Sequence, residues 1–387
     1  MAVSRDILLI STADWDNPSW TNKQHMAVHF AKRGYRVLYV ESLGLRRATA
    51  TGQDFSRITR RVRKTFRALR QVRENIWVHS PSALPGGSVC AKLLNQYLVT
   101  YRIKRCLGKL GMNRPMVWTY NPMVWPWVNK LKRDLLVYHC VDDLSAQPGM
   151  PAEALQEADK KMAGITDIVF TTGPRIDLRF KEWVPDKTYC FPNVADYEHF
   201  RQARTDLPIP EAMASIPSPR IGFIGAIAEY KVDFDLISQV ARSRPEWHWV
   251  MIGKVGEGQP NTRVDKLKAP NIHLLGPRAY AELPQYLAHM DVVAIPCCLN
   301  DYTRSMFPMK FFEYLAAGKV IVATQLEALQ EYSHVCLLAD DAEGLEEHIA
   351  TALADLGPCL ATGDALAKEN TWDIRMDAML RILQEYQ

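Results

Sequence analysis

Short runs of Val, Ile and Leu recur along this chain at intervals that leave room for a helix between one run and the next. Buried apolar strands that alternate with helices are typical of a parallel sheet. Seven runs lie in the first half of the chain, at 6–11, 36–41, 76–80, 116–120, 135–141, 167–172 and 188–192. Six lie in the second half, at 220–225, 248–253, 271–276, 291–296, 319–324 and 335–338. The pattern therefore predicts the α/β class, with two doubly wound parallel sheets.

The two sets of runs predict two domains. At 387 residues, 48% of them hydrophobic, the chain is long enough for two domains with cores of ordinary size. Residues 201–219 are rich in proline and poor in large apolar residues, as interdomain linkers often are. We therefore expect a first domain over 1–200, a second over 220–370 and a final amphipathic helix over 371–387. Its predicted apolar face consists of Trp372, Ile374, Met379, Leu380 and Leu383.

Positive charge gathers in one part of the first half. Residues 46–73 hold ten basic side chains against one acid, and apolar residues at helical spacing predict a basic amphipathic helix from Ser56 onward. A second basic stretch covers 92–109. Such a surface can lie on anionic lipid, although its apolar stripe could instead pack on its own domain. The segment 46–109 thus predicts peripheral contact with a membrane, and nucleic acid is not expected because no binding motif accompanies the charge.

The compartment and the cofactors are constrained by what the sequence lacks. The N-terminus shows no signal-peptide pattern, and no apolar run approaches the roughly 20 residues that cross a bilayer. The eight cysteines form no C-x-x-C pair, so we expect reduced thiols, a cytoplasmic protein and no metal site. No glycine precedes Gly34 after the first strand, which argues against a nicotinamide or flavin cofactor.

The segment 301–324 has the features of an anion site. A loop containing Pro308 leads into a short predicted helix that carries Lys310 and Glu313 and ends at Gly318, before an apolar strand. The two charged residues are three apart and share a helix face. A cation for phosphate beside a carboxylate for sugar or ribose hydroxyls suits a nucleotide sugar. The alternative is a core helix with a solvated lysine and glutamate.

This segment carries a family resemblance. The pattern Pro308-x-Lys310-x-x-Glu313-Tyr-Leu-Ala-Ala-Gly318 resembles the donor site of GT-B glycosyltransferases, most closely the family 4-like bacterial enzymes of exopolysaccharide and teichuronic-acid assembly. It is more distantly similar to the xanthan glucuronosyltransferase. The resemblance implies two Rossmann-like domains facing across a cleft and a C-terminal helix that crosses back to the first domain. Family 4 enzymes usually carry two glutamates here; Glu313 matches the second, and Ser305 stands at the first.

The resemblance also implies which residues hold the donor. The loop after the first strand of the second domain would face the diphosphate through Gly225, although Ala226 stands where many relatives have an arginine. A later loop would hold the nucleobase by backbone hydrogen bonds. The expected donor residues are Gly225, Lys254, Arg278, Tyr280, Pro308, Met309, Lys310 and Glu313.

Acceptor and catalytic groups are expected in the first domain. Asp142 and Asp143 follow a strand, where ligands of parallel sheets bind, and mutual repulsion would raise one pKa toward that of a general base. They resemble the Tyr-x-x-x-Asp-Asp motif of the exopolysaccharide enzymes, and His139 is a further candidate base. One aspartate could instead cap the next helix. The polar, aromatic loop after the first strand offers acceptor-binding groups, namely Asp14, Trp15, Trp20 and Asn22, although Trp15 or Trp20 could equally be a packing residue.

These features predict a glycosyltransferase. It would move a sugar from a nucleoside diphosphate sugar, with a UDP-sugar favoured, to a hydroxyl of a lipid-linked or polysaccharide acceptor in cell-surface glycan synthesis. We expect it at the inner face of the cell membrane, with no cofactor and no required metal, because lysine and backbone dipoles can replace one. The alternatives are a UDP-sugar 2-epimerase of the same fold and a catalytically degenerate nucleotide-binding scaffold.

Overall fold

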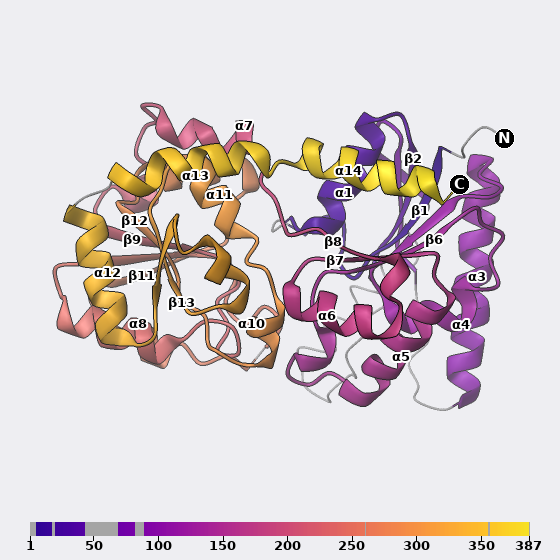
Figure 1. Ribbon diagram of the computed structural model, residues 1–387, viewed down its shortest axis with the longest axis horizontal. Helices are drawn as coiled ribbons and strands as arrows, with labels where there is room; N and C mark the ends of the chain where they lie inside the picture. The colour runs from indigo at the N-terminus through magenta and orange to yellow at the C-terminus, as the bar shows by residue number, and fades with distance from the viewer. Residues whose placement is uncertain are drawn as a thin grey trace.

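The computed structural model describes residues 5–17, 20–42, 69–81, 89–259, 261–354 and 357–386. Two α/β domains lie side by side along the long axis of the molecule (Figure 1). The first sheet has the order β3-β4-β2-β1-β5-β6-β7-β8, and the second has the order β11-β10-β9-β12-β13-β14. All pairs are parallel except β3 with β4. The predicted fold class is therefore confirmed.

Every predicted strand is present. The strands of the first sheet are β1 (Asp6–Ile10), β2 (Arg36–Val40), β3 (Arg70–Arg73), β4 (Ile76–His79), β5 (Met116–Thr119), β6 (Leu136–Cys140), β7 (Ile168–Thr171) and β8 (Thr188–Cys190). Those of the second are β9 (Arg220–Ile224), β10 (His248–Ile252), β11 (Ile272–Gly276), β12 (Val292–Ile295), β13 (Ile321–Thr324) and β14 (Cys336–Ala339).

Helices cover both faces of each sheet. Around the first sheet lie α1 (Asn22–Lys32), α3 (Val89–Leu110), α4 (Trp125–Val128), α5 (Ala152–Ile165) and α6 (Pro174–Trp183). The second domain holds α7 (Tyr197–Phe200), α8 (Phe234–Ser243), α9 (Leu283–Ala288), α10 (Asp301–Ser305), α11 (Lys310–Ala316), α12 (Ala342–Ala354) and α13 (Gly357–Glu369). Alternate residues of β1 enter two different cores, Ile7 and Leu9 on one face and Leu8 and Ile10 on the other. That alternation explains why the strands are apolar throughout.

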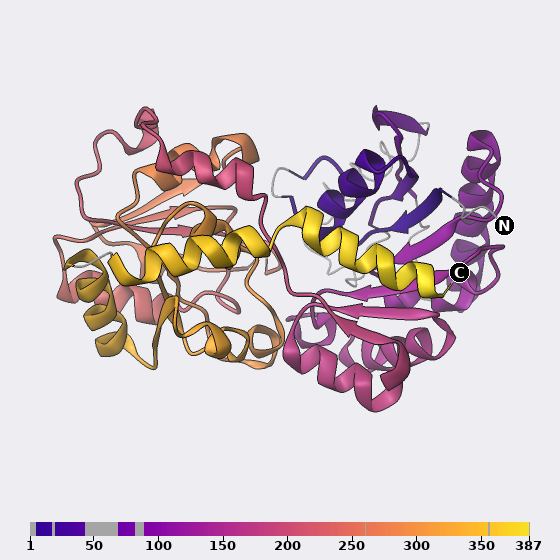
Figure 2. The same cartoon turned by 45° about the horizontal axis from the view of Figure 1, so that its top comes forward.

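The last helix, α14 (Trp372–Glu385), lies on the first domain (Figure 2). Trp372, Met376, Met379 and Leu383 belong to the same core as residues of β1. Their spacing follows one helical stripe. Ile374, which we expected on this face, is instead 50% exposed, because it lies two positions from Trp372 and points away from the stripe.

Residues 201–219, expected to link the domains, instead pack on the second domain. Met213 and Ile216 are buried in its core. Arg204 donates hydrogen bonds to the carbonyls of Leu315 and Ala316, both at 2.8 Å. The chain passes between the domains earlier, since Val194 belongs to a core of the first domain and Ala195 to a core of the second. Ala195 forms a parallel bridge with Thr371, so the two passages of the chain run side by side.

The last residues of the predicted basic helix form a β-strand instead. Residues 70–73 form β3 at the edge of the first sheet, antiparallel to β4, with Asn75 in a left-handed turn conformation (φ 60°) between them. Side chains of this strand alternate between half-buried and exposed. The rest of that helix, residues 56–68, lies outside the described residues.

Three glycines end neighbouring strands of the second sheet. Gly225 follows β9, Gly253 follows β10 and Gly276 closes β11, and the amide of Gly253 donates to the carbonyl of Gly276 at 3.0 Å. A Cβ on Gly253 would lie 1.7 Å from the carbonyl oxygen of Gly225, and its φ of 151° is strongly disfavoured for other residues. The sheet edge therefore requires glycine at this position.

We expect Gly253→Ala to lower the free energy of unfolding by about 3 kcal/mol or more, since both the clash and the backbone strain must be relieved. Urea denaturation followed by circular dichroism measures the free energy of unfolding. Gly164→Ala in α5 is the matched control, because a Cβ there meets no atom within 4 Å. Equal midpoints for the two variants would contradict this account of the sheet edge.

Candidate functional site

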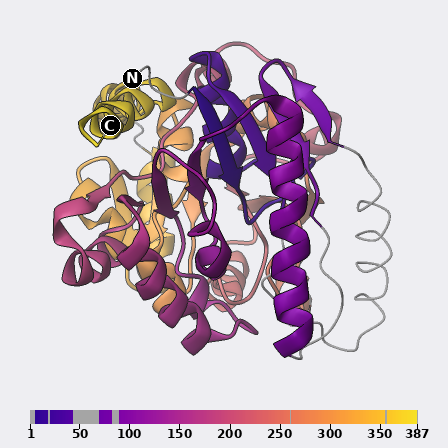
Figure 3. The same cartoon turned by 90° about the vertical axis from the view of Figure 1, so that its right-hand side faces the viewer.

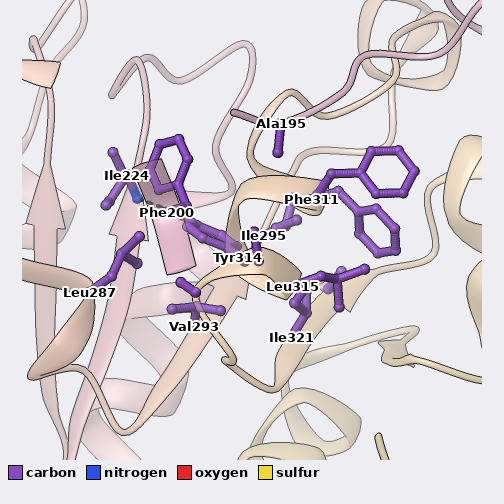
Figure 4. Close-up of a cluster of buried hydrophobic side chains, with 14 of the residues drawn as sticks. Ala195, Phe200, Ile224, Leu287, Val293, Ile295, Phe311, Tyr314, Leu315 and Ile321 are labelled. Atoms are coloured by element: carbon purple, nitrogen blue, oxygen red, sulfur yellow. Dashed lines mark hydrogen bonds between the residues drawn. The ribbon is translucent and has the colours of Figure 1, made fainter. Parts of the chain in front are cut away.

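The helix α11 presents one polar face. Phe311, Tyr314 and Leu315 are buried in the second domain (Figure 4), and so is Phe312. The amide of Ile224 donates to the Tyr314 hydroxyl at 2.8 Å, which fixes α11 against the end of β9. Gly318 (φ 70°) then turns the chain toward β13. The helix is thus held in place by its apolar residues, and Lys310 and Glu313 remain on the other side.

Lys310 and Glu313 form an ion pair that is mostly out of solvent. Their side chains are 22% and 4% exposed, and Nζ of Lys310 lies 2.5 Å from Oε2 of Glu313. Burial raises the pKa of Glu313, while the ammonium of Lys310 opposes that shift. Lys310 also lies over the ring of Phe200, 5.7 Å from its centre. The expected alternative, a solvated glutamate on a core helix, is therefore wrong for Glu313.

An aromatic cluster, which we call the aromatic junction, joins the domains beside this pair. It consists of Trp20, His25, His199, Tyr280 and Trp372. Tyr280 stacks on His199 at 4.5 Å between ring centres and on Trp20 at 6.5 Å. His25 stacks on Trp372 at 4.9 Å. Burial lowers the pKa of His25 to about 3, and the charge of Lys310 contributes to this shift. Lys310 of α11 therefore lies near α1.

Two predicted ligand residues therefore meet in the aromatic junction. Trp20 was expected to bind the acceptor and Tyr280 the nucleobase, and here they stack on each other across the domains. The Tyr280 hydroxyl is buried with no hydrogen-bond partner among the described residues. It is a polar atom that a ligand at this position can satisfy.

Further contacts join the two domains near residues 301–307. The Asn193 side chain donates to the carbonyl of Phe307 at 2.9 Å. A Cβ on Gly173, which precedes α6, would lie 2.4 Å from the carbonyl oxygen of Ser305. The guanidinium of Arg175 lies 3.5 Å from the carboxylate of Asp301. Ser305, which stands at the position of the first family glutamate, is thus buried at the domain contact and donates its hydroxyl to the carbonyl of Asp301.

The two adjacent aspartates have different surroundings. Asp143 is bound to the Arg179 guanidinium at 2.7 Å and accepts hydrogen bonds from the amide and hydroxyl of Ser145, so it caps the short turn after β6. Asp142 lies 3.7 Å from Nζ of Lys23 and accepts a hydrogen bond from the Tyr302 hydroxyl at 3.3 Å. Each carboxylate therefore has its own cationic partner, Lys23 for Asp142 and Arg179 for Asp143.

His139 is the wrong candidate for a base. Alternation along β6 places it on the sheet face that α14 covers, where it is fully buried. Its ring stacks on Tyr120 at 5.0 Å, and Arg375 donates to its Nε2 at 3.1 Å. Burial lowers its pKa well below the usual range. A neutral imidazole held inside the first domain is a packing group.

Two predicted acceptor residues are also packing groups. Trp15 is buried edge-on against Tyr39, at 5.2 Å between ring centres. Asn22 is buried in the first turn of α1, and its amide lies 3.1 Å from both the Tyr120 hydroxyl and the Asn193 side chain. The loop that we expected there ends at Thr21, which caps α1. Asp14, like Trp20, keeps partial exposure, and its carbonyl accepts a hydrogen bond from Gln24.

The remaining predicted donor residues lie after the carboxyl ends of strands in the second sheet and at the start of α11. Lys254 is exposed just after β10, and the Arg278 guanidinium lies over the Tyr286 ring at 5.6 Å. Pro308 is buried at the start of α11, and Met309 is half-buried. Across the residues that the structure describes, no group of three or more His, Cys, Asp or Glu side chains is arranged to hold a metal ion.

Sequence reasoning missed Lys23, Tyr302, Arg179 and Arg375. Lys23 lies in the polar first turn of α1, which is buried even though its sequence, Asn-Lys-Gln-His, suggests a surface turn. Tyr302 and Arg179 reach the aspartates from α10 and α6. Only the three-dimensional fold reveals these contacts, because each joins residues far apart in the chain.

Comparisons with known proteins match part of the second domain. Residues 218–355 match the family described as glycosyl transferases group 1. The chain is 31% identical over 141 residues to a putative teichuronic acid biosynthesis glycosyltransferase of Bacillus subtilis, a match that covers 36% of this chain and 35% of that protein. It thus spans about a third of the length of this curated relative.

Solved structures match over nearly the whole chain. A sucrose-phosphate synthase from Thermosynechococcus elongatus superposes with a TM-score of 0.74 at 14% identity, covering 98% of both chains. Anabaena HepE, solved with UDP and glucose, gives 0.67 at 15% identity, covering 97% of this chain and 98% of that one. The solved structures show the GT-B fold, and the match of residues 218–355 together with the Bacillus subtilis relative confirms the family 4-like resemblance expected from the sequence.

Proposed function

We propose that this protein is a glycosyltransferase that moves a sugar from a nucleoside diphosphate sugar, with a UDP-sugar favoured, to a hydroxyl of a lipid-linked or polysaccharide acceptor in cell-surface glycan synthesis. The observation that carries the proposal is the Lys310–Glu313 pair of α11, placed beside the domain contact inside the matched family region. The UDP and glucose of the HepE structure support the choice of donor. The name of the Bacillus subtilis relative supports a surface glycan as the product.

The donor would lie against the second domain. The diphosphate needs positive charge as the bond to the sugar breaks, and Lys310 supplies a full charge held in position by Glu313 and the Phe200 ring. Glu313 then has one carboxylate oxygen for a ribose or sugar hydroxyl. The ends of β9 and β10 carry Gly225 and Gly253, and Arg278 and Tyr280 are the groups expected at the nucleobase. No metal is required in this proposal.

The acceptor would approach from the first domain. Asp142 is the aspartate that faces the second domain, since Tyr302 of α10 reaches it, and it keeps 30% of its side chain exposed. It is therefore our candidate for the general base, in place of Asp143 and His139. Holding donor and acceptor together between two domains supplies the proximity that transfer requires.

The membrane contact is proposed on the helix α3. It lies on the outer side of the first domain, away from the second (Figures 1 and 3). Its described part exposes Leu94, Tyr97 and Tyr101 next to Lys104 and Arg105, and this combination suits an anionic lipid surface at the inner face of the membrane. No helix among the described residues is both long and apolar enough to span a bilayer. Co-sedimentation with phosphatidylglycerol vesicles, lost in Tyr97→Ser/Tyr101→Ser, tests this contact; unchanged binding by that variant would refute it.

A two-step experiment tests the proposed function. A thermal-shift screen against UDP-, GDP- and TDP-sugars first identifies the base and the sugar, because a ligand that binds the folded state raises the midpoint. Release of the nucleoside diphosphate is then measured with and without lipid-linked and polysaccharide acceptors. The transferase releases it only when an acceptor is added. Sugar isomerisation without an acceptor would identify the 2-epimerase, and binding with neither reaction would identify the scaffold.

A further inference from the structure

Lys23 is a buried cation that the proposed mechanism has not yet used. Its side chain is 9% exposed in the first turn of α1, and Nζ lies 3.7 Å from Oδ2 of Asp142 and 5.7 Å from the centre of the Tyr120 ring. Burial lowers the pKa of Lys23, and Asp142 is the main group that opposes this shift. An ammonium so far from water persists only with a partner, and Asp142 is the carboxylate that pairs with it.

The other groups around Asp142 come from both domains. Tyr302 donates to Oδ1 from α10, and Lys231, in the loop after β9, lies over the Tyr302 ring at 5.9 Å. The charge of Lys231 also acts on Lys23. The neighbouring Asp143 is directed to Arg179, and the Cys140 thiol approaches the carbonyl of Asp142 rather than its carboxylate. Lys23 thus contacts the carboxylate of Asp142 directly.

We propose that Lys23 is the positioning residue of the general base: its buried ammonium holds the Asp142 carboxylate in place and orients it toward the acceptor hydroxyl. This inference rests on the proposed function. A bound diphosphate brings negative charge into the interdomain region and would favour protonation of a lone carboxylate there. The buried ammonium of Lys23 offsets that effect, and Tyr302 fixes the second oxygen.

The proposed step balances as a single group transfer. The acceptor oxygen forms a bond to the anomeric carbon as the bond from that carbon to the diphosphate oxygen breaks. The bonding electrons leave with the diphosphate, next to Lys310. The hydroxyl proton moves to Asp142, which becomes neutral. Lys23 is then buried without a counter-charge, so the pair favours return of that proton to solvent once the product leaves.

The pH profile of transfer tests the positioning role. Lys23→Met is expected to lower kcat at pH 7 at least tenfold and to move the acidic limb of the kcat profile up by about one pH unit or more, because the carboxylate of the base loses the cation that lies 3.7 Å from it. The donor KM should change less than threefold. Lys23→Arg should restore most of kcat, since it keeps the charge. Lys32→Met, on the exposed last turn of the same helix, is the matched control and should behave as the wild type.

A stability cycle tests the ion pair without any activity. Urea unfolding of Lys23→Met, Asp142→Asn and the double variant should show coupling, with the double variant losing less stability than the two single losses together. If the stability losses of the two single variants are additive in the double variant, the ion pair between Lys23 and Asp142 is refuted. The positioning role would be overturned if the two substitutions are coupled in stability but Lys23→Met leaves the acidic limb of the kcat profile unmoved. It would also be overturned if Lys23→Met weakens only donor binding. If the wild type transfers sugar to no acceptor, the proposed function and the base role both fail, while the cycle still decides whether the pair exists.

Discussion

Lys310→Ala is expected to abolish donor binding, with a loss in affinity for the nucleoside diphosphate of at least about 100-fold, or about 2.7 kcal/mol. The substitution removes the ammonium that would face the diphosphate. It also leaves the buried carboxylate of Glu313 without its cation, so that a repulsive charge replaces an attractive one. Isothermal titration with the nucleotide identified by the thermal-shift screen measures the effect.

A second substitution separates the two causes. Lys310→Ala/Glu313→Gln removes the repulsion as well, so it should bind the nucleotide more tightly than Lys310→Ala alone while remaining weaker than the wild type. Lys268→Ala is the control, because Lys268 is an exposed lysine of the same domain that pairs with the exposed Asp265. Wild-type affinity in Lys310→Ala would refute the donor site.

Asp142→Asn is expected to reduce kcat by about 100- to 10,000-fold, the usual contribution of a general base. Donor affinity should stay within a few-fold, because the substitution keeps the shape of the side chain and lies on the first domain. Acceptor-dependent release of the nucleoside diphosphate gives kcat, and titration of the donor gives its affinity.

Asp143→Asn is the paired comparison. It keeps the cap on the turn after β6 but loses the charge opposite Arg179, so it should cost about 1–3 kcal/mol of stability and leave kcat within a few-fold. The sequence alone treated the two aspartates as equivalent candidates. An inactive Asp143→Asn together with an active Asp142→Asn would reverse the assignment.

The strands were predictable because their signal is local. A strand buried on both faces must be apolar at nearly every position, so the runs at β1, β9 and β13 are visible without knowing their neighbours. The edge strand β3 gives no such signal: its side chains are only half-buried on one face, and its residues, Arg70 to Arg73, look like the end of a basic helix. Its pairing with β4 is seen only in the folded structure and not in the local sequence.

The linker was mispredicted for a related reason. Residues 201–219 have no regular apolar period, because their short 3-10 turns place Met213 and Ile216 in the core at irregular spacing. The proline content of this segment suggested a linker that packs on neither domain. Packing against α11 through Arg204, more than a hundred positions before it in the chain, makes the segment part of the second domain instead.

The candidate site was predictable only where its residues are close in sequence. Lys310 and Glu313 are three apart on one helix, and their pairing follows from that spacing. The roles of Asp142, Asp143 and His139 depend on Lys23, Arg179 and Arg375, which come from α1, α6 and α14. No local pattern in residues 139–143 shows which side chain faces the second domain.

A structure of the protein with the bound donor nucleotide tests the central claim most directly. The account predicts the diphosphate between the two domains, with an oxygen within about 3 Å of Nζ of Lys310 and the nucleobase beside Tyr280 and Arg278. A diphosphate bound elsewhere, with Lys310 still paired only to Glu313, would contradict it.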